Sequence, residues 1–391
     1  MTGRADERRA RVTIAVEQLR REVPGGIGRY ARGLLDGLRE LGAPPVELVA
    51  SRLCGGGPDP LAAWGFPVRT SALPAPFLTA AWDRGFAPVR GARVVHAVSL
   101  AVPPVRPRRP RGGAALVVTV HDLAWRTHPE ATTPRGRRWH EAALARALEH
   151  ADAFVVPSAA VARDLVAAGA PSERARVIVH GVDHLPAPDT AAAAAVLRRA
   201  GVEGEYLLAA ATREPRKNLR GLVAAYTRAR PSLVRAWPLV VVGPKGWGDT
   251  RLDGAGTEGV VVTGAVDDAV LAALYAGARA FAYVPLTEGF GLPPLEAMAC
   301  GTPVVVSDTV PSTTPRDFSG ENHGAGPRAR GAQAALRVDP GTLDEIAAAL
   351  VRASGDDALR SALVAAGRDL VAPLTWKASA AAHASWWEAV A

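Results

Sequence analysis

Cysteine is nearly absent from this chain, which has only Cys54 and Cys300 among its 391 residues. Two cysteines are too few for a disulfide framework or a cysteine-rich zinc cluster. No apolar run approaches the length of a membrane span, and residues 1–11 are polar and charged, unlike a signal peptide. The sequence also lacks a Walker loop, a serine nucleophile elbow and a nucleic-acid-binding motif. We therefore expect a cytoplasmic protein without a structural zinc site.

What the chain does contain is apolar sequence for more than one core. Apolar residues make up 48% of it, and its length exceeds what a single core usually serves. Short apolar runs alternate with helix-length stretches, a pattern typical of parallel sheets covered on both faces. The expected strands are Val12–Val16, Val46–Ala50, Val94–Val98, Leu116–Val120, Phe154–Val156, Val177–Val179, Tyr206–Ala210, Leu239–Val242, Val260–Val262, Phe281–Val284, Pro303–Val306 and Leu336–Val338. A proline-containing break from His184 to Thr190 predicts domains at residues 1–185 and 186–372.

The segment between Glu288 and Glu296 is the most informative part of the chain. It follows an expected strand, and its glycines, Gly289 and Gly291, allow a tight turn before a helix. Free amides at the N-terminus of a helix bind phosphates, whereas the two carboxylates are suited to hydroxyl groups. Together they predict a nucleotide-sugar site, although each glutamate taken alone is compatible with an ordinary solvated position.

A cationic segment follows the first expected strand of the second domain. It contains Arg213, Arg216 and Lys217 near the start of a helix, where cations oppose the helix dipole. Because that placement is unfavourable without a partner, we expect an anion to bind there. A departing nucleoside diphosphate gains negative charge as its glycosidic bond breaks, and a fixed cation lowers that barrier.

A glycine-containing loop is expected after the first strand. Gly26, Ile27 and Gly28 would let the backbone approach a phosphate or a sugar closely. The alternative is a nicotinamide-type dinucleotide loop, with Ala31 at its third glycine position. That alternative leaves the two glutamates and the cationic segment of the second domain unexplained.

His121 follows an expected strand, at the end where open parallel sheets place their ligands. The adjacent Asp122 is suited to orienting this histidine, to touching an acceptor or to capping the next turn. Asp267 and Asp268 are interpreted as the start of a helix, with Asp267 as its N-cap, and not as a metal site.

These segments resemble, in the same order, the motifs of retaining glycosyltransferases of family 4. Glu288 to Asp308 resembles the family signature, Thr212 to Leu219 its phosphate-contacting segment, Gly25 to Tyr30 its glycine loop, and His121-Asp122 its N-domain histidine. The N-terminal motifs look most like bacterial mannosyltransferases of polysaccharide and glycolipid assembly. The resemblance implies the GT-B fold, an α/β architecture of two Rossmann-like, doubly wound parallel-sheet domains with a cleft between them. It also implies a last helix, 373–391, that packs back on the first domain.

The resemblance further implies what individual residues do. Glu296 would bind the ribose, Lys217 the diphosphate together with the amides of Gly291 and Leu292, and His121 and Glu288 the transferred sugar. Lys217, His121 and Glu288 would form the catalytic set. Other donor contacts would come from Thr212, Arg213, Arg216, Val266, Gly289 and Phe290, and sugar or acceptor contacts from Gly26, Ile27, Gly28 and Asp122. No metal and no cofactor is implied, and the co-substrate would be a GDP- or UDP-sugar.

The chain departs from the family pattern in two places. Thr212 stands where many relatives have arginine, and Ala211 where they have glycine. Between Thr309 and Gln333 the loop is longer, is rich in Gly, Pro and Arg, and lacks the usual glutamate, which suggests either a lid or an insertion. Trp386 and Trp387, in the last helix, are expected to pack against the first domain.

The net charge of +8 and the isoelectric point of 10.1 point to an anionic partner or to arginine-rich composition alone. We favour weak peripheral contact with an anionic membrane, at its inner face, over composition bias, and both over nucleic acid. The denser basic patch is Arg106, Arg108, Arg109 and Arg111.

The leading hypothesis is hexose transfer, with mannose first, to a glycan, a glycolipid or a small-molecule hydroxyl. Hydrolysis or phosphorolysis of a glycoside, with the two glutamates flanking the bond, is the second hypothesis. A nucleotide-sugar-binding protein without turnover is the third.

Overall fold

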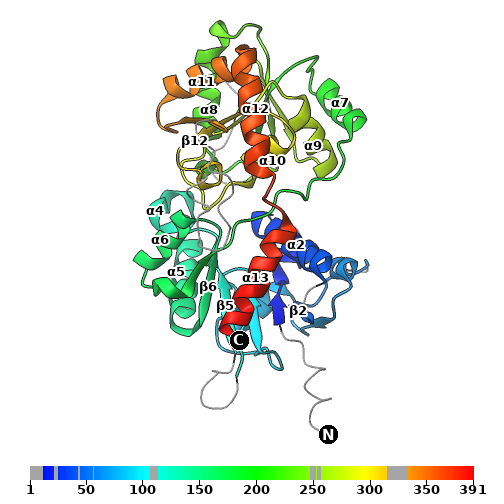
Figure 1. Cartoon of the computed structure of the whole chain (residues 1–391), viewed down its shortest axis with the longest axis vertical. Helices are drawn as coiled ribbons and strands as arrows, with labels where there is room; N and C mark the ends of the chain where they lie inside the picture. The colour runs from blue at the N-terminus through cyan, green and yellow to red at the C-terminus, as the bar shows by residue number, and fades with distance from the viewer. Residues whose placement is uncertain are drawn as a thin grey trace.

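The computed structural model describes residues 12–21, 25–42, 45–55, 57–105, 113–246, 252, 257–314 and 333–391. These residues form two lobes stacked along the long axis of the molecule, each built on its own parallel sheet (Figure 1). The expected α/β fold class of two doubly wound domains is therefore confirmed.

The first sheet has the strand order β3-β2-β1-β4-β5-β6-β7. Its strands are β1 (Val12–Ala15), β2 (Val46–Ala50), β3 (Val68–Thr70), β4 (Val94–Ala97), β5 (Ala115–Thr119), β6 (Ala153–Val156) and β7 (Ala175–Val177). The helices of this lobe are α2 (Gly25–Leu41), α3 (Ala75–Trp82), α4 (Ala124–Thr127), α5 (Pro134–His150) and α6 (Ala159–Ala167).

The second sheet repeats the plan with the order β10-β9-β8-β11-β12-β13. Its strands are β8 (Leu207–Ala210), β9 (Leu239–Val242), β10 (Val260–Gly264), β11 (Ala280–Tyr283), β12 (Val304–Ser307) and β13 (Leu336–Val338). Its helices are α7 (Thr190–Arg199), α8 (Leu219–Ala229), α9 (Asp268–Gly277), α10 (Leu292–Ala299), α11 (Leu343–Gly355) and α12 (Asp357–Val371).

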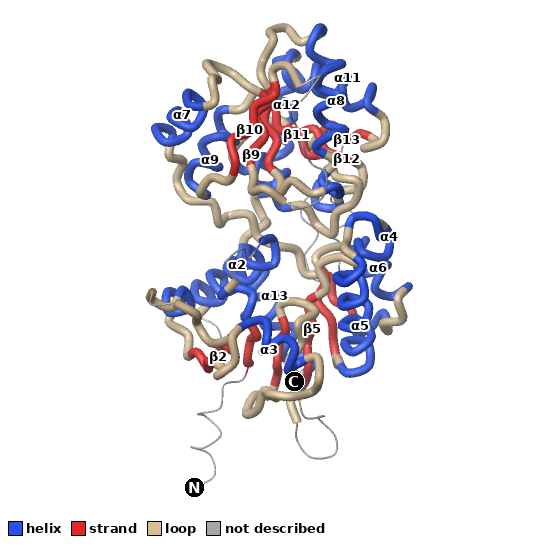
Figure 2. Tube along the Cα trace, turned by 180° about the vertical axis from the view of Figure 1, so that it is seen from behind, coloured by secondary structure: helices blue, strands red, loops and turns tan. Residues whose placement is uncertain are grey.

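Both sheets are buried on two faces. Along β8, Leu207 and Ala209 pack into one apolar core, and Leu208 and Ala210 pack into another. Figure 2 shows the helices that cover them, with α7 and α9 on one side of the second sheet and α8 and α11 on the other. This alternation explains why the strands are apolar at nearly every position.

In each sheet the strand order reverses at one point, between β1 and β4 in the first and between β8 and β11 in the second. Ligands of open parallel sheets bind outside the carboxyl ends of the strands at such switch points. The topology therefore directs the search for a site to the loops after these four strands.

The last helix, α13 (Trp376–Val390), leaves the second lobe and packs on α2 of the first (Figure 1). Trp376 and Trp387 are buried in the core of the first lobe, and Trp386 packs at its edge. The chain passes between the lobes twice. The two connecting segments lie side by side, since the amide of Val182 donates to the carbonyl of Leu374 at 2.9 Å.

Glycines let α13 approach α2 this closely. A Cβ added at Gly37 would lie 2.1 Å from the carbonyl oxygen of Trp376, whereas one added at Gly26, in the same helix, would meet nothing within 4 Å.

We expect Gly37→Ala to lower the free energy of unfolding by about 1–3 kcal/mol, because the clash outweighs alanine's helix propensity. Gly26→Ala, the matched control, should leave stability equal or raise it. Urea unfolding of both variants measures the difference, and equal midpoints would refute the close-packing argument.

All twelve expected strands are present, with ends displaced by at most two residues. The short edge strand β3 was missed because only one of its three residues is apolar. The expected glycine loop at Gly26–Gly28 is wrong in conformation, since these residues form the first turn of α2.

Arg106 to Arg111 and most of the 309–333 loop lie outside the described residues. Among the helices of the described residues, none is long and apolar enough to cross a bilayer.

Candidate active site in the interdomain cleft

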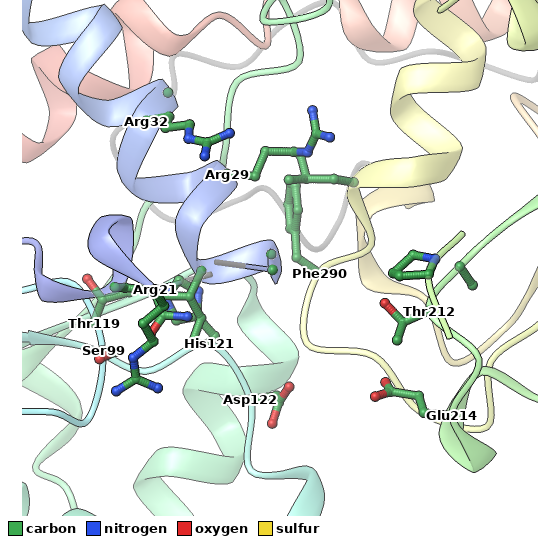
Figure 3. Close-up of a pocket in the computed structure, with 18 of the residues that line it drawn as sticks. Arg21, Arg29, Arg32, Ser99, Thr119, His121, Asp122, Thr212, Glu214 and Phe290 are labelled. Carbon is green, nitrogen blue, oxygen red and sulfur yellow. The ribbon is translucent and has the colours of Figure 1, made fainter. Parts of the chain in front are cut away.

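A cavity of about 1790 Å³ lies between the two lobes, at the carboxyl ends of both sheets. It is larger than a typical pocket for one small molecule, so it has room for more than one ligand. Figure 3 shows the two walls: His121 and Asp122 on the side of the first lobe, and Thr212, Glu214 and Phe290 on the side of the second.

Glu288 is the centre of a mostly buried charged cluster on the second wall. Its carboxylate accepts hydrogen bonds from Lys217 Nζ at 2.5 Å, from the Tyr283 hydroxyl at 2.7 Å and from Arg216 Nη1 at 3.2 Å. Burial alone would raise the pKa of Glu288, but Lys217 and Arg216 outweigh it and hold that pKa well below its usual range. Glu288 is therefore ionised, and two cations stand beside it.

Local geometry places the two cations. Pro215–Lys217 form a single turn of 3-10 helix, and Asn218 follows in the left-handed region with a φ of 52°. The carbonyl of Arg216 accepts the amide of Leu286 at 2.9 Å, which ties this turn to the loop after β11. The cationic segment expected from sequence thus lies at the switch point between β8 and β11.

The N-terminus of α10 borders the same space. Gly291 has a φ of 93°, Pro293 lies in the first turn, and Gly291 and Leu292 both line the cavity. Ser312 holds the turn, because its amide donates to Phe290 at 3.0 Å and its hydroxyl to Gly291 at 2.6 Å. Amides at this helix end are available to an anion, as the sequence predicts.

Glu296 lies one helical turn further, 2% exposed. Its carboxylate accepts from the His184 imidazole at 2.9 Å and from the Tyr275 hydroxyl at 3.1 Å, and Arg29 Nε of the first lobe lies 3.7 Å away. Burial would raise the pKa of Glu296, yet His184 and Arg29 outweigh it and lower that pKa. Glu296 is thus a fixed, ionised acceptor at the edge of the cavity.

His121 faces this cluster from the end of β5. Its Nε2 lies 2.9 Å from the carbonyl of Val98, and its ring meets that of Tyr30 edge-on at 4.9 Å. Burial lowers the pKa of His121, which keeps the imidazole neutral at pH 7. The lobes touch beside it, where Ser158 donates to the carbonyl of Gly289 at 2.8 Å.

The structure brings most of the expected site residues to one cavity. The lining includes His121, Asp122, Gly26, Ile27, Thr212, Arg216, Lys217, Val266, Glu288, Phe290, Gly291, Leu292 and Glu296. Arg213, Gly28 and Gly289 are not part of the lining. Asp122 also accepts the amide of Ala124 at 3.1 Å, the turn-capping bond that was one of its expected uses.

Four partners in the site were missed by sequence reasoning: Arg29, His184, Tyr275 and Tyr283. Arg29 lies directly after the glycines, and it joins the lobes through an ion pair with Asp268 at 2.6 Å. No local signal links Arg29 or His184 to Glu296, because they are distant in sequence.

Asp267 caps α9, as expected, by accepting the amide of Val270 at 2.9 Å.

The charge states argue against glycoside hydrolysis. A hydrolase of this kind needs one carboxylic acid with a raised pKa as proton donor. Both Glu288 and Glu296 instead have lowered pKa values.

Within the part of the chain that the structure describes, no group of three or more His, Cys, Asp or Glu side chains is arranged to hold a metal ion.

The rings of His121, His180 and His383 pack around Tyr30, and His96 stacks on His383 with ring centroids 5.6 Å apart. The Tyr30 hydroxyl lies 2.8 Å from His383 Nε2 of α13 and 3.0 Å from the Thr119 hydroxyl. Burial lowers the pKa of each of these histidines, and that of His383 falls to about 4. The folded protein therefore keeps them neutral.

We expect the stability of the protein to fall as the pH drops from about 6.5 to about 4. Unfolded His383 binds a proton near pH 6.5, whereas folded His383 binds it only near pH 4, so the free energy of unfolding decreases as the pH falls across that window. The lowered pKa values of His96, His121 and His180 act in the same direction. For His383 alone the loss is on the order of 3 kcal/mol. Thermal unfolding between pH 7.5 and 4.5 tests this, and His383→Gln should flatten part of the slope. A midpoint constant over that range contradicts it.

Comparison with known proteins supports one family. The first lobe matches the model of Glycosyltransferase Family 4 over residues 24–184, and the second that of glycosyl transferases group 1 over residues 204–356. O-antigen chain mannosyltransferase B of Escherichia coli is 32% identical over 270 residues, which cover 67% of each chain.

Solved structures agree on the fold. Sucrose-phosphate synthase from Thermosynechococcus elongatus has a TM-score of 0.67 and 21% identity, over 97% of this chain and 98% of that one. The Anabaena protein HepE, solved with UDP and glucose, has a TM-score of 0.67 and 17% identity, over 97% and 99%. The chain is a glycosyltransferase of the GT-B fold and belongs to glycosyltransferase family 4.

Proposed function

We propose that the chain transfers mannose, with retention of configuration, from GDP-mannose or a related nucleotide sugar to a hydroxyl of a glycan or lipid-linked glycan. The observation that carries this proposal is the mostly buried Lys217–Glu288–Arg216 cluster beside the N-terminus of α10, opposite His121. The mannosyltransferase of Escherichia coli supports the choice of sugar.

The cluster suits a nucleoside diphosphate as leaving group. Lys217 and Arg216 supply positive charge, and Gly291 and Leu292 supply amides, where negative charge develops as the glycosidic bond breaks. Glu296, held by His184 and Tyr275, is left to accept from a ribose hydroxyl. Glu288 and the neutral His121 would hold the hydroxyls of the transferred sugar.

Retention follows in this proposal from attack on the same face that the leaving group departs from, with the departing phosphate taking the acceptor's proton. Glu288 is poorly suited to be a covalent nucleophile, since hydrogen bonds from Lys217, Arg216 and Tyr283 stabilise its charge, although its carboxylate can still accept a bond from a sugar hydroxyl. The cations also supply charge that a divalent metal supplies in other sites.

The test is a transfer assay with GDP-mannose, UDP-glucose and other nucleotide sugars on glycan acceptors, with and without EDTA. We expect one donor to be used, activity to survive EDTA, and NMR of the product to give the anomeric configuration of the donor. Binding of nucleotide sugars without transfer to any acceptor would favour the non-catalytic alternative, and an inverted product would refute retention.

Peripheral contact with an anionic membrane, at the cytoplasmic face, is also a proposal and rests on the net charge of +8. Co-sedimentation with phosphatidylglycerol vesicles should fall between 50 and 500 mM salt. Equal co-sedimentation with neutral vesicles would refute an electrostatic contact.

A further inference from the structure

An aromatic cluster lies on the first-lobe wall of the cavity, outside the residues assigned to the donor. Trp125 of α4 and Trp139 and His140 of α5 all line the cavity. The rings of Trp125 and His140 are stacked with centroids 4.7 Å apart, and Trp139 meets His140 edge-on at 4.9 Å. Three rings from two helices therefore pack together, with Trp139 and His140 half-buried and Trp125 buried behind them.

One polar atom of each ring is held by a hydrogen bond within the protein. Trp139 Nε1 donates to Asp83 at 2.9 Å, Trp125 Nε1 donates to Glu141 at 2.9 Å, and His140 Nδ1 lies 2.8 Å from the carbonyl of Gly136. Two arginines hold the acids in turn, Arg146 that of Asp83 and Arg126 that of Glu141. The rings are thus fixed before any ligand arrives, which lowers the entropic cost of binding.

The cluster lines the same cavity as the reacting centre. α4 begins two residues after Asp122, at the same end of the sheet as His121, on the wall opposite Lys217 and Glu288. In the proposed reaction an acceptor hydroxyl reaches the transferred sugar from the first lobe, so this wall is available to the rest of the acceptor. A pyranose presents a face of C–H groups, which packs on the electron-rich face of an indole.

We infer that Trp139, supported by His140 and Trp125, forms an acceptor subsite that stacks on a neutral pyranose ring of a glycan. This inference rests on the proposed glycosyl transfer and deepens it by naming the wall that holds the acceptor. It also implies that the enzyme selects its acceptor by recognising a carbohydrate ring next to the reacting hydroxyl.

Trp64 provides a matched control. It is half-buried like Trp139, lies in the same lobe, and its Nε1 donates to Asp36 at 2.9 Å, yet it does not line the cavity. Loss of packing and of an indole hydrogen bond is therefore common to Trp64→Leu and Trp139→Leu. Only the second removes a ring from the cavity.

The experiment measures binding in the full chain with excess GDP and UDP, using the methyl glycosides of mannobiose, cellobiose and chitobiose as probes. We expect at least one glycoside to bind, Trp139→Leu to weaken its Kd at least fivefold, and Trp64→Leu to leave it unchanged. Nucleotide Kd values should not change in either variant. The subsite is refuted if no glycoside binds, if both variants weaken glycoside binding equally, or if Trp139→Leu weakens nucleotide binding as much.

A measurement on the unmutated sequence keeps the test decisive if Trp139→Leu does not fold. In protein labelled with 5-fluorotryptophan, the resonance of Trp139 is the one that is missing from the ¹⁹F spectrum of Trp139→Phe. In the parent protein this resonance should shift when the glycoside is added. An unshifted resonance overturns the subsite. Binding needs no turnover, so absent transfer counts against the proposed function alone. Transfer with an acceptor KM unaltered by Trp139→Leu overturns the subsite alone.

Discussion

Lys217→Ala is expected to lower kcat by roughly 100- to 1000-fold, equivalent to about 2.7–4 kcal/mol of transition-state stabilisation. The Lys217 ammonium is fixed by Glu288 and by the Tyr283 hydroxyl at 2.7 Å, and it faces the cavity beside the N-terminus of α10. A cation held in this way needs no reorganisation when charge develops on a leaving diphosphate. Arg216 remains in the variant, so we expect a residual rate above background.

The measurement is kcat with a saturating donor, together with the Kd values of GDP and guanosine. Lys217→Ala should weaken GDP but not guanosine, since only the diphosphate contacts the ammonium. Lys377→Ala is the control, because that lysine of α13 pairs with Glu40 of α2 at 3.1 Å and does not line the cavity. A kcat for Lys217→Ala within about threefold of the parent would show that the phosphates bind elsewhere.

The sequence was sufficient for features that local physics decides. The strands were predictable because buried parallel strands are apolar along their whole length. The loop from Glu288 to Glu296 was predictable because Gly291 supplies the positive φ, and Pro293 fits a first helical turn. Asp267 was recognisable as a cap for the same local reason.

Contacts between the lobes were not predictable in that way. Arg29 reaches Asp268 across 239 positions, and His184 reaches Glu296 across 112. Each pairing depends on how the two sheets are placed by the crossing segments at Val182 and Leu374. The expected loop at Gly26 is wrong, because glycine is compatible with a helix as well as with a loop. Those glycines begin α2, and Gly33 and Gly37 further along it allow α13 to dock.

Gly289→Ala is the second substitution for which we expect a large loss of kcat. A Cβ added there would lie 2.0 Å from the carbonyl oxygen of His121 and 2.8 Å from Cβ of Asp122. Backbone atoms cannot move aside as a flexible side chain can, so Gly289→Ala has to separate the walls of the cavity near the reacting centre. A displacement of about 1 Å can cost roughly 100-fold in rate, and we expect a fall in kcat of that size.

Stability should separate this effect from a folding defect. Gly289 lies between the lobes and not within either core, so Gly289→Ala should keep the thermal midpoint within a few degrees. It should also keep the Kd of GDP, because Lys217 and Glu288 belong to the second lobe alone. Gly57→Ala is the control, since a Cβ at that position meets nothing within 4 Å. Gly289→Ala with the parent kcat would mean that the lobes do not need this contact for transfer. A fall in nucleotide affinity equal to the fall in kcat would instead locate the damage in the donor site.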